Sequence, residues 1–364
     1  MKRLELLDCG RFIAACCVMM FHYFYNGISN LKISSIRHVP EIVSVAKYGY
    51  LGVEFFFMIS GYVIFFSARN RSASEFAVSR AVRLFPAFWA AVLFTSTVAY
   101  FWGAPSMSVG LSQMLTNLTM IPQFFGFAYV DGVYWTLQLE LSFYGLVLLC
   151  LLVGWQERLR TLFLLWPAAM LLAYFAGMRN FPLLGGYYYY FAAGALFAVQ
   201  KESPSKYGWS ALLLCLYFCV RFSLEKAANI FGGQHIAYSP FILKAVTCAS
   251  FAFFLSLNSK MGSSVRVPGS KLMGSLTYPL YLVHAHFGYM FISRFATEAN
   301  KWGIYLLAVS LSMSTAYLIH RFTEKKYAAQ WHGLFSRSLG RLVHLVNIQT
   351  LKIPRVWSTL FSRS

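Results

Sequence analysis

Uninterrupted apolar stretches long enough to form membrane-spanning helices recur along the whole 364-residue chain. A helix needs about 20 mostly apolar residues to cross a hydrocarbon layer about 30 Å thick. Hydrophobic residues make up 58% of the chain and charged residues only 12%, whereas soluble domains average about 25% charged residues. The stretches are continuous rather than alternating, which disfavours a transmembrane β-barrel. We therefore expect an all-α, polytopic integral membrane protein.

Ten segments have the length and composition of membrane spans. They cover residues 8–27, 48–68, 84–102, 133–153, 161–177, 187–200, 208–223, 240–257, 274–294 and 303–322. A further apolar segment, 104–130, contains Pro105 and Pro122, so we expect it to be re-entrant or interfacial. The sequence therefore predicts about ten transmembrane helices.

Basic residues are concentrated in alternate loops. If the N-terminus is cytoplasmic, the cytoplasmic loops hold most of the Lys and Arg residues, whereas the outer segment 103–130 has none. This positive-inside distribution predicts that both termini face the cytoplasm. It also accounts for the net charge of +19, so we expect membrane lipids around the protein and no nucleic-acid partner.

Basic and apolar residues are mixed in the chain that follows the last span, as in Arg337, Leu339 and Arg341. This pattern is typical of an amphipathic helix on an anionic membrane surface, although a loosely ordered basic tail has the same composition. We therefore predict a transmembrane domain over residues 1–327 and a basic amphipathic cytoplasmic tail over residues 328–364.

Ionisable side chains inside the predicted spans are few. They are Asp8, Arg11, His22, Glu54, Glu140, His284, His286 and His320. A charged group at the bilayer centre costs about 3 kcal/mol on insertion scales. Groups that are kept there despite this cost are candidates for function.

Arg11 and His22 lie on the first predicted span, eleven residues apart. At about 100° per residue this is close to three helical turns, so both side chains face one side of the helix, about 16 Å apart along its axis. Arg11 would lie near the cytoplasmic end and His22 beyond the middle. The pair is a candidate functional stripe, although a snorkelling arginine and an interfacial histidine would show the same spacing.

Glu54, Glu140 and His284 are expected at a depth similar to that of His22, each on a different span. A carboxylate beside an imidazole fixes its tautomer and raises its basicity. Either glutamate could orient His22 in this way, and the residues alone do not choose between them. A structural polar cluster that joins helices is the alternative.

Arg80 and Arg83 stand three residues apart on the approach to the third predicted span. Two guanidinium groups on one helical face can bind phosphate groups through paired hydrogen bonds. They can equally anchor the helix end at the cytoplasmic surface.

Six short motifs, in order within residues 5–327, resemble those of the acyltransferase-3 family of membrane acyltransferases. They are Arg11 followed after ten residues by His22, the acidic and aromatic run 52–61 ending in Ser-Gly, the Arg-x-x-Arg run 80–86, the Trp-Thr-Leu and Glu of 134–140, the run 278–284 ending in His, and 322–325. Glu54 stands where the family more often has Asp, and Thr136 where it has Ser, and both keep the chemistry. We expect the standalone form, without a soluble domain after the spans.

This resemblance implies an O-acyltransferase that takes an acyl group, expected to be acetyl, from acetyl-CoA in the cytoplasm. Bacterial members of the family mostly acetylate cell-surface glycans. The expected acceptor is therefore a hydroxyl group of a surface or lipid-linked glycan, such as O-antigen or exopolysaccharide, and the expected location is the bacterial inner membrane. The resemblance implies no metal ion.

The resemblance also implies a role for each residue singled out above. His22 would act as general base or accept the acyl group itself, with Glu54 or Glu140 orienting it. The donor phosphates would be bound by Arg11, Arg80 and Arg83. The pore lining, or the stabilisation of the oxyanion, would come from Thr136, Tyr281 and His284. The acceptor site would be shaped by segments 103–130 and 231–235.

Two other classes of membrane protein use buried charges. A transporter or translocator of a lipid-linked glycan would line its pathway with them, and a structural or assembly protein would use them to join helices. The six ordered motifs favour the acyltransferase.

Overall fold

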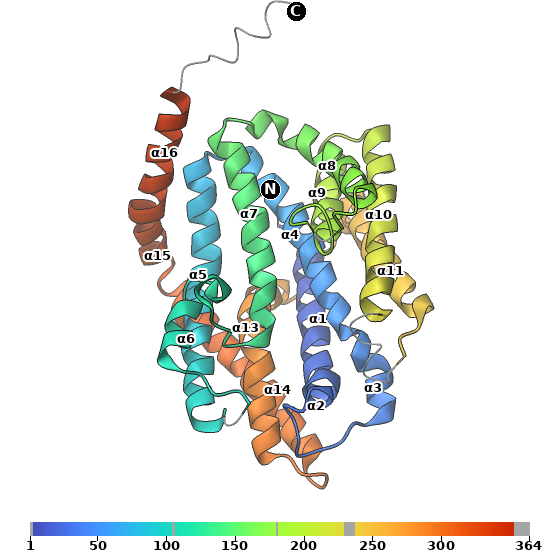
Figure 1. Ribbon diagram of the computed structural model, residues 1–364, viewed down its shortest axis with the longest axis vertical. Helices are drawn as coiled ribbons and strands as arrows, with labels where there is room; N and C mark the ends of the chain where they lie inside the picture. Colours follow the sequence, from blue (N-terminus) through green and yellow to red (C-terminus); the bar gives the residue numbers. More distant parts are fainter. Residues whose placement is uncertain (1–2, 104–105, 180, 229–236, 353–364) are drawn as a thin grey trace, which may run out of the picture.

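The computed structural model describes residues 3–103, 106–179, 181–228 and 237–352, which form a bundle of long helices without a β-strand (Figure 1). The long helices are α1 (Glu5–Phe21), α4 (Leu51–Arg69), α5 (Ala73–Trp102), α7 (Trp135–Leu152), α8 (Leu159–Phe175), α9 (Tyr188–Glu202), α10 (Lys206–Lys226), α11 (Pro240–Asn258), α13 (Ser270–Phe295) and α14 (Lys301–Ile319). The shorter helices are α2 (Gly27–Ser29), α3 (Pro40–Ala46), α6 (Leu111–Asn117), α12 (Lys260–Ser264), α15 (Ala328–Phe335) and α16 (Arg341–Lys352).

Each of the ten predicted spans coincides with one of the long helices. Within the described residues, eight helical segments are long and apolar enough to cross a membrane, and α9 and α13 are the two long helices outside that set. Helix α1 begins and α16 ends at the same end of the bundle (Figure 1), as an even number of crossings requires. The prediction of an all-α polytopic membrane protein is confirmed.

Helix α9 has only 15 residues and is therefore about 22 Å long at about 1.5 Å per residue. Every residue from Tyr188 to Gln200 is buried, and α4, α8, α10 and α11 surround the helix. A helix shielded in this way does not face lipid, so its length need not match the bilayer. The short span predicted at 187–200 is thus a helix of the protein interior.

Helix α13 has 26 residues, but His284, His286 and several tyrosines lower its mean hydropathy. It is buried continuously from Leu276 to Ile292 and packs against α1, α5 and α14. Polar groups on such a helix face other helices rather than lipid. Helix α13 is therefore the wall against which a polar site can be built.

Helix α5 begins at Ala73, eleven residues before the predicted start of the third span. Ser72 accepts a hydrogen bond from the Glu75 backbone N–H, and the Glu75 carboxylate accepts one from the Ser72 N–H, which closes a capping box. Arg80 and Arg83 therefore lie inside a helix rather than on the approach to it. Their spacing of three residues places them on one helical face.

The segment between α5 and α7 folds back along α5. Helix α6, with 7 residues, is too short to cross a bilayer, and Trp89 Nε1 of α5 donates a hydrogen bond of 2.9 Å to the Leu118 carbonyl oxygen. Asn117 is fully buried and accepts a hydrogen bond of 2.9 Å from the Val130 N–H. This geometry agrees with the prediction that the segment does not span the membrane.

Helices α15 and α16 follow α14 and pack along α5. Phe335 of α15 lies against Val78 and Ala81 of α5, so part of the apolar face of the predicted tail is covered by protein. Residues 353–364 lie outside the described residues. The division of the chain after residue 327 stays a prediction.

Helices α4 and α9 approach closely because a glycine stands at the contact on each helix. A Cβ atom added to Gly61 would overlap the Phe191 backbone oxygen, and one added to Gly194 would overlap the Met58 backbone oxygen. Small residues at such crossings let helix backbones approach one another in membranes. The contact fixes the position of α4, which carries part of the candidate site.

Gly61→Ala should separate α4 from α9 and lower the unfolding free energy by about 1–3 kcal/mol through overpacking. Gly145→Ala in α7 is the matched control, because a Cβ atom there meets no other atom within 4 Å. Thermal unfolding of the detergent-solubilised variants measures the difference. Equal melting temperatures for the two variants would contradict the proposed close contact.

Candidate active site

Three cavities of the described chain meet one another through shared lining residues. The arginine cavity, of about 230 Å³, is lined in part by Arg11, Ser60, Arg80, Arg83, Thr136, Glu140, Tyr144, Tyr278 and Tyr281. The basic pocket, of about 800 Å³, is lined in part by Arg80, Arg83, Lys271, Ser275, His320, Glu324 and Lys325. The histidine cavity, of about 390 Å³, is lined in part by His22, Asn26, Lys32, Tyr50, Trp135, Tyr187, Lys226, Tyr281, His286 and Tyr289.

The arginine cavity brings together the three arginines singled out in the sequence, Arg80 and Arg83 from α5 and Arg11 from α1. Arg83 lies 3.7 Å from the Glu324 carboxylate, and its guanidinium lies 5.3 Å from the centre of the Tyr278 ring. Arg11 Nε is buried and has no hydrogen-bond partner in the described part of the chain. Guanidinium donors without a full set of partners are suited to bind an anion.

Glu140 is the carboxylate among the described residues that line the arginine cavity. It accepts a hydrogen bond of 2.6 Å from Ser60 Oγ and another from the Tyr144 hydroxyl, one turn further along α7. Three guanidinium groups thus share this cavity with one carboxylate. The resulting positive charge favours an anionic ligand.

The basic pocket continues the arginine cavity, because Arg80 and Arg83 line both. Lys271 and Lys325 add further positive charge to its wall. Glu324 lies between Arg83 and His320. Its carboxylate is 3.7 Å from the Arg83 guanidinium and 2.9 Å from His320 Nδ1. Forked guanidinium groups flanked by lysines are the side chains that proteins use to bind phosphate groups.

His22 is the first residue of a π-helical turn, His22–Asn26, that follows α1. Such turns within helices are frequent at functional sites. The His22 Nδ1 atom is hydrogen-bonded to the Tyr289 hydroxyl of α13. Asn26 Nδ2 donates a hydrogen bond of 2.7 Å to the same hydroxyl. The turn therefore directs His22 and Asn26 together toward α13.

His284 lies beside His22, with ring centres 5.1 Å apart and ring planes inclined at 64°. Its Nδ1 lies 2.9 Å from the Tyr281 carbonyl oxygen and 3.1 Å from that of Leu280. Because carbonyl oxygens only accept hydrogen bonds, Nδ1 carries the proton and Nε2 has a free lone pair. Nε2 is buried without a hydrogen-bond partner among the described residues.

The two predicted carboxylate partners of His22 are engaged elsewhere. Glu54 is buried and pairs at 3.2 Å with Lys226 of α10, which is also buried. Glu140 is held in the arginine cavity as described above. In the described structure, the Tyr289 hydroxyl takes the position beside His22 at which the sequence predicted a carboxylate.

Asp131 connects the loop before α7 to α13. It is fully buried and accepts hydrogen bonds from the backbone N–H groups of Val133, at 3.1 Å, and His286, at 2.9 Å. His286 Nε2 in turn accepts a hydrogen bond of 3.2 Å from the Gly132 N–H and lies 2.7 Å from Lys32 Nζ. His286 therefore holds the wall of the histidine cavity in place.

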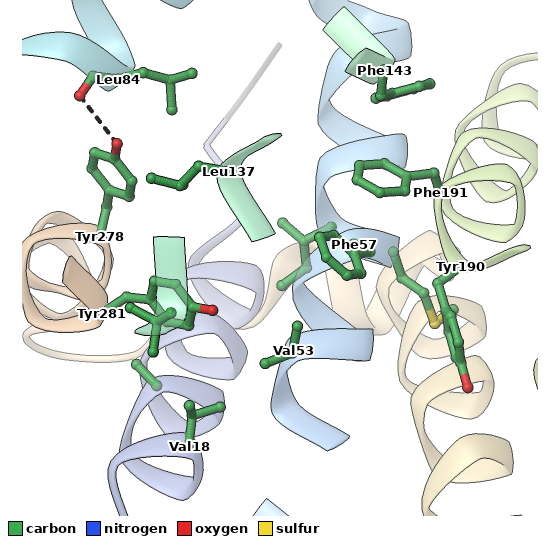
Figure 2. Packing of buried hydrophobic residues seen from close by; sticks show 14 of the residues in the cluster. Val18, Val53, Phe57, Leu84, Leu137, Phe143, Tyr190, Phe191, Tyr278 and Tyr281 are labelled. Atoms are coloured by element: carbon green, nitrogen blue, oxygen red, sulfur yellow. Dashed lines mark hydrogen bonds between the residues drawn. The ribbon is translucent and has the colours of Figure 1, made fainter. Parts of the chain in front are cut away.

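Tyr281 lies where the arginine and histidine cavities meet, and it lines both. Its hydroxyl is 3.0 Å from Thr136 Oγ1, and Thr136 donates its own hydrogen bond, of 2.8 Å, to the Val133 carbonyl oxygen. Figure 2 shows Tyr281 directed from α13 toward the space beside Val53 of α4.

The structure therefore divides the predicted site residues between two places. Around the arginine cavity it gathers Arg11, Arg80, Arg83, Thr136, Glu140 and Tyr281. At the histidine cavity it places His22, with His284 in contact with it. Glu54 joins neither lining and reaches the histidine cavity only through Lys226.

Several residues of the site were not singled out in the sequence, among them Asn26, Asp131, Lys226 and Tyr289. Asn26 follows His22 by four residues, so its position on the same helical face was available from the spacing. The other three come from distant segments that only the fold brings together. Segment 231–235, predicted to shape the acceptor site, lies outside the described residues.

The described residues contain no group of three His, Cys, Asp or Glu side chains placed to hold a metal ion.

Glu54→Leu or Lys226→Met alone should lower the unfolding free energy by about 3–5 kcal/mol, because each leaves an uncompensated buried charge. The double variant should recover much of this loss, since it removes both charges. Thermal unfolding in detergent measures the three variants. A double variant as unstable as the sum of the single changes would contradict the ion pair.

Comparisons with known proteins show which family the chain belongs to. The model of the acyltransferase-3 family, described as an acyltransferase domain, matches residues 4–321. The chain is also similar to nodulation protein 10 of Rhizobium leguminosarum bv. viciae, at 31% identity over 41% of this chain and 44% of that protein. The matched part of the chain thus covers less than half the length of this curated relative. No solved structure matches the chain. The chain belongs to the acyltransferase-3 family of membrane acyltransferases.

Proposed function

We propose that the protein transfers an acetyl group from cytoplasmic acetyl-CoA to a hydroxyl group of a cell-surface or lipid-linked glycan, in the inner membrane of a bacterium. One observation carries the proposal: the basic pocket, the arginine cavity and the histidine cavity form a series. The first two share Arg80 and Arg83, and the last two share Val53 and Tyr281. Phosphate-binding groups thus stand at one end of the series and an imidazole at the other.

The donor end suits a coenzyme that carries phosphate groups on a long arm. The phosphates would bind Arg80 and Arg83, with Lys271 and Lys325 beside them in the basic pocket. The arm would enter the arginine cavity, where Arg11 supplies a further cation. Glu140 holds Ser60 and Tyr144 in this cavity and would position its wall rather than react.

The acceptor end suits a sugar. Trp135, Tyr50, Tyr187 and Tyr289 give the histidine cavity aromatic surfaces, and Asn26 adds an amide. Aromatic walls with a few convergent polar groups are typical of sites that bind small organic ligands. A sugar ring has apolar faces for such walls and hydroxyl groups for the polar side chains.

His22 would act as the general base. With a proton on Nδ1, it donates to the Tyr289 oxygen and leaves the Nε2 lone pair free for the acceptor hydroxyl. The hydroxyl proton passes to Nε2 while the acceptor oxygen forms a bond to the acyl carbon. The carbon–sulfur bond of the thioester then breaks, and the thiolate takes the proton to give the free thiol.

Tyr289 and His284 would position His22 rather than react. The Tyr289 hydroxyl orients the His22 ring through its hydrogen bond with Nδ1, as a carboxylate does in catalytic triads, and it accepts this bond when His22 is in the form that acts as a base. The His284 ring packs against the His22 ring, 5.1 Å from it between centres.

Surface glycan from cells with and without the gene tests the reaction and its acceptor together. Cells with the gene should carry additional O-acetyl groups, detected by NMR and mass spectrometry. His22→Ala should lower this acetylation about 100-fold or more, the usual contribution of a general base. His344→Ala, on the exposed side of α16, is the matched control and should acetylate normally.

A fully active His22→Ala protein, present at the normal level, would contradict the role of His22. An unchanged glycan in all strains would contradict the acceptor. Normal glycan export without acetyl transfer from radiolabelled acetyl-CoA would instead favour the translocator.

Arg83→Ala should raise the KM for acetyl-CoA about tenfold or more, the effect of losing one charged hydrogen bond. The KM for the acceptor should change little, because Arg83 is not among the described residues that line the histidine cavity. Arg160→Ala, an exposed arginine at the start of α8, is the control. An unchanged KM for acetyl-CoA in Arg83→Ala would leave Arg83 as a membrane-surface anchor.

A further inference from the structure

The arginine and histidine cavities adjoin one another at two shared side chains. Among their described lining residues, Val53 of α4 and Tyr281 of α13 are the two that both cavities share. Val53 is 9% exposed and Tyr281 7% exposed, so each contacts neighbouring protein over nearly its whole surface. Figure 2 shows the two side chains on facing helices, with Val18 of α1 nearby. A group that moves from one cavity to the other therefore passes these two side chains.

The Tyr281 side chain is held in place on several sides. Its hydroxyl donates to Thr136 Oγ1 at 3.0 Å, because the Thr136 hydroxyl is already committed as donor to the Val133 carbonyl oxygen. Phe56 packs edge-on against its ring, with centres 5.6 Å apart, and His284 lies 5.7 Å away. Rotation of Tyr281 would leave a buried hydroxyl without a partner. The Tyr281 side chain is therefore held in one position.

Val53 is held equally firmly by its helix. Gly52, its neighbour on α4, packs directly against the Ala14 backbone of α1, where a Cβ atom would lie 2.7 Å from the Ala14 oxygen. On the other side, α4 is fixed to α9 through Gly61 and Gly194. Helix α4 therefore cannot move away from α13 to widen the passage without breaking both contacts.

We propose that Val53 and Tyr281 form a fixed constriction that limits the length of the acyl group transferred. The inference rests on the proposed function, since it assumes a donor in the arginine cavity and an acceptor beside His22. The acyl carbon has to reach the histidine cavity while the coenzyme arm stays behind. An acetyl group ends in a single methyl, whereas each further methylene adds volume where the side chains cannot move aside.

The chemical step is the same for every acyl length. The acyl carbon–sulfur bond breaks, the acyl carbon–oxygen bond to the acceptor forms, and the acceptor proton ends on the coenzyme thiol. The constriction thus changes which thioester reaches His22 and leaves the chemistry of the transfer unaltered. Selection by a hydrophobic passage is expected to discriminate by about 10-fold or more for a change of a few methylene groups.

The test compares acetyl-CoA with butyryl-CoA as competing donors for one purified protein, with both products quantified by mass spectrometry. Val53→Ala should raise the ratio of butyryl to acetyl product by about tenfold or more over the natural chain. Val92→Ala is the matched control, because Val92 is a buried valine of α5 and lines none of the three cavities described. The ratio in this control should equal that of the natural chain.

Tyr281→Phe provides a second variant, in which the ring keeps its size but loses its link to Thr136. The freed ring can turn, so the product ratio should shift in the same direction by a smaller factor. Because both products come from one preparation, partial loss of folded protein does not alter the ratio.

The outcomes separate the constriction from the proposed function. Acetyl transfer by all variants with an unchanged product ratio would overturn the constriction and leave the proposed function intact. Absence of transfer from either donor in the natural chain would overturn the proposed function itself. A ratio that rises equally in Val92→Ala would show that general loosening of the core, rather than this passage, controls acyl length.

Discussion

The crossing of α1 and α13 is the contact on which the candidate site depends. Gly288 lies directly under the Tyr23 ring, where a side chain on α13 would overlap it. The Tyr23 hydroxyl donates to the His284 carbonyl oxygen at 2.9 Å and contacts Ser312 Oγ at 2.7 Å, which ties α14 to the same crossing. No water competes for such hydrogen bonds within a bilayer. The crossing therefore fixes His22, the residue before Tyr23, at a defined place beside α13.

The membrane also explains how the charged groups around the site are paired. A charge deep in the bilayer needs a partner, and Glu54 and Lys226 supply one another. The arginine cavity is lined by three guanidinium groups and one carboxylate. Arg80 and Arg83 also line the basic pocket, where an anionic donor would neutralise the remaining positive charge. Neutral imidazole and phenol groups cost less to bury. Under the proposed function, donor binding and proton transfer take place in separate parts of one series of cavities.

Helix positions and family motifs could be predicted from the sequence because both are local along the chain. Apolar length determined the ten helices, and the order of six motifs pointed to the family. Depth in the membrane was also local, and it placed Glu54, Glu140 and His22 at one level. Which of these side chains meet depends on how each helix is rotated about its axis, and close contacts such as that at Gly288 decide the rotation. Tyr289 therefore could not be predicted as the partner of His22, since it lies 267 residues away in the chain.

The central claim is that the donor lies with its phosphates at Arg80 and Arg83 and its sulfur directed toward Tyr281 and His22. A cryo-electron microscopy structure of the protein with bound coenzyme A tests this most directly. The claim predicts density for the phosphates against the two arginines and density for the arm in the arginine cavity, ending near Tyr281. Coenzyme A bound in the histidine cavity, or held away from both arginines, would contradict it.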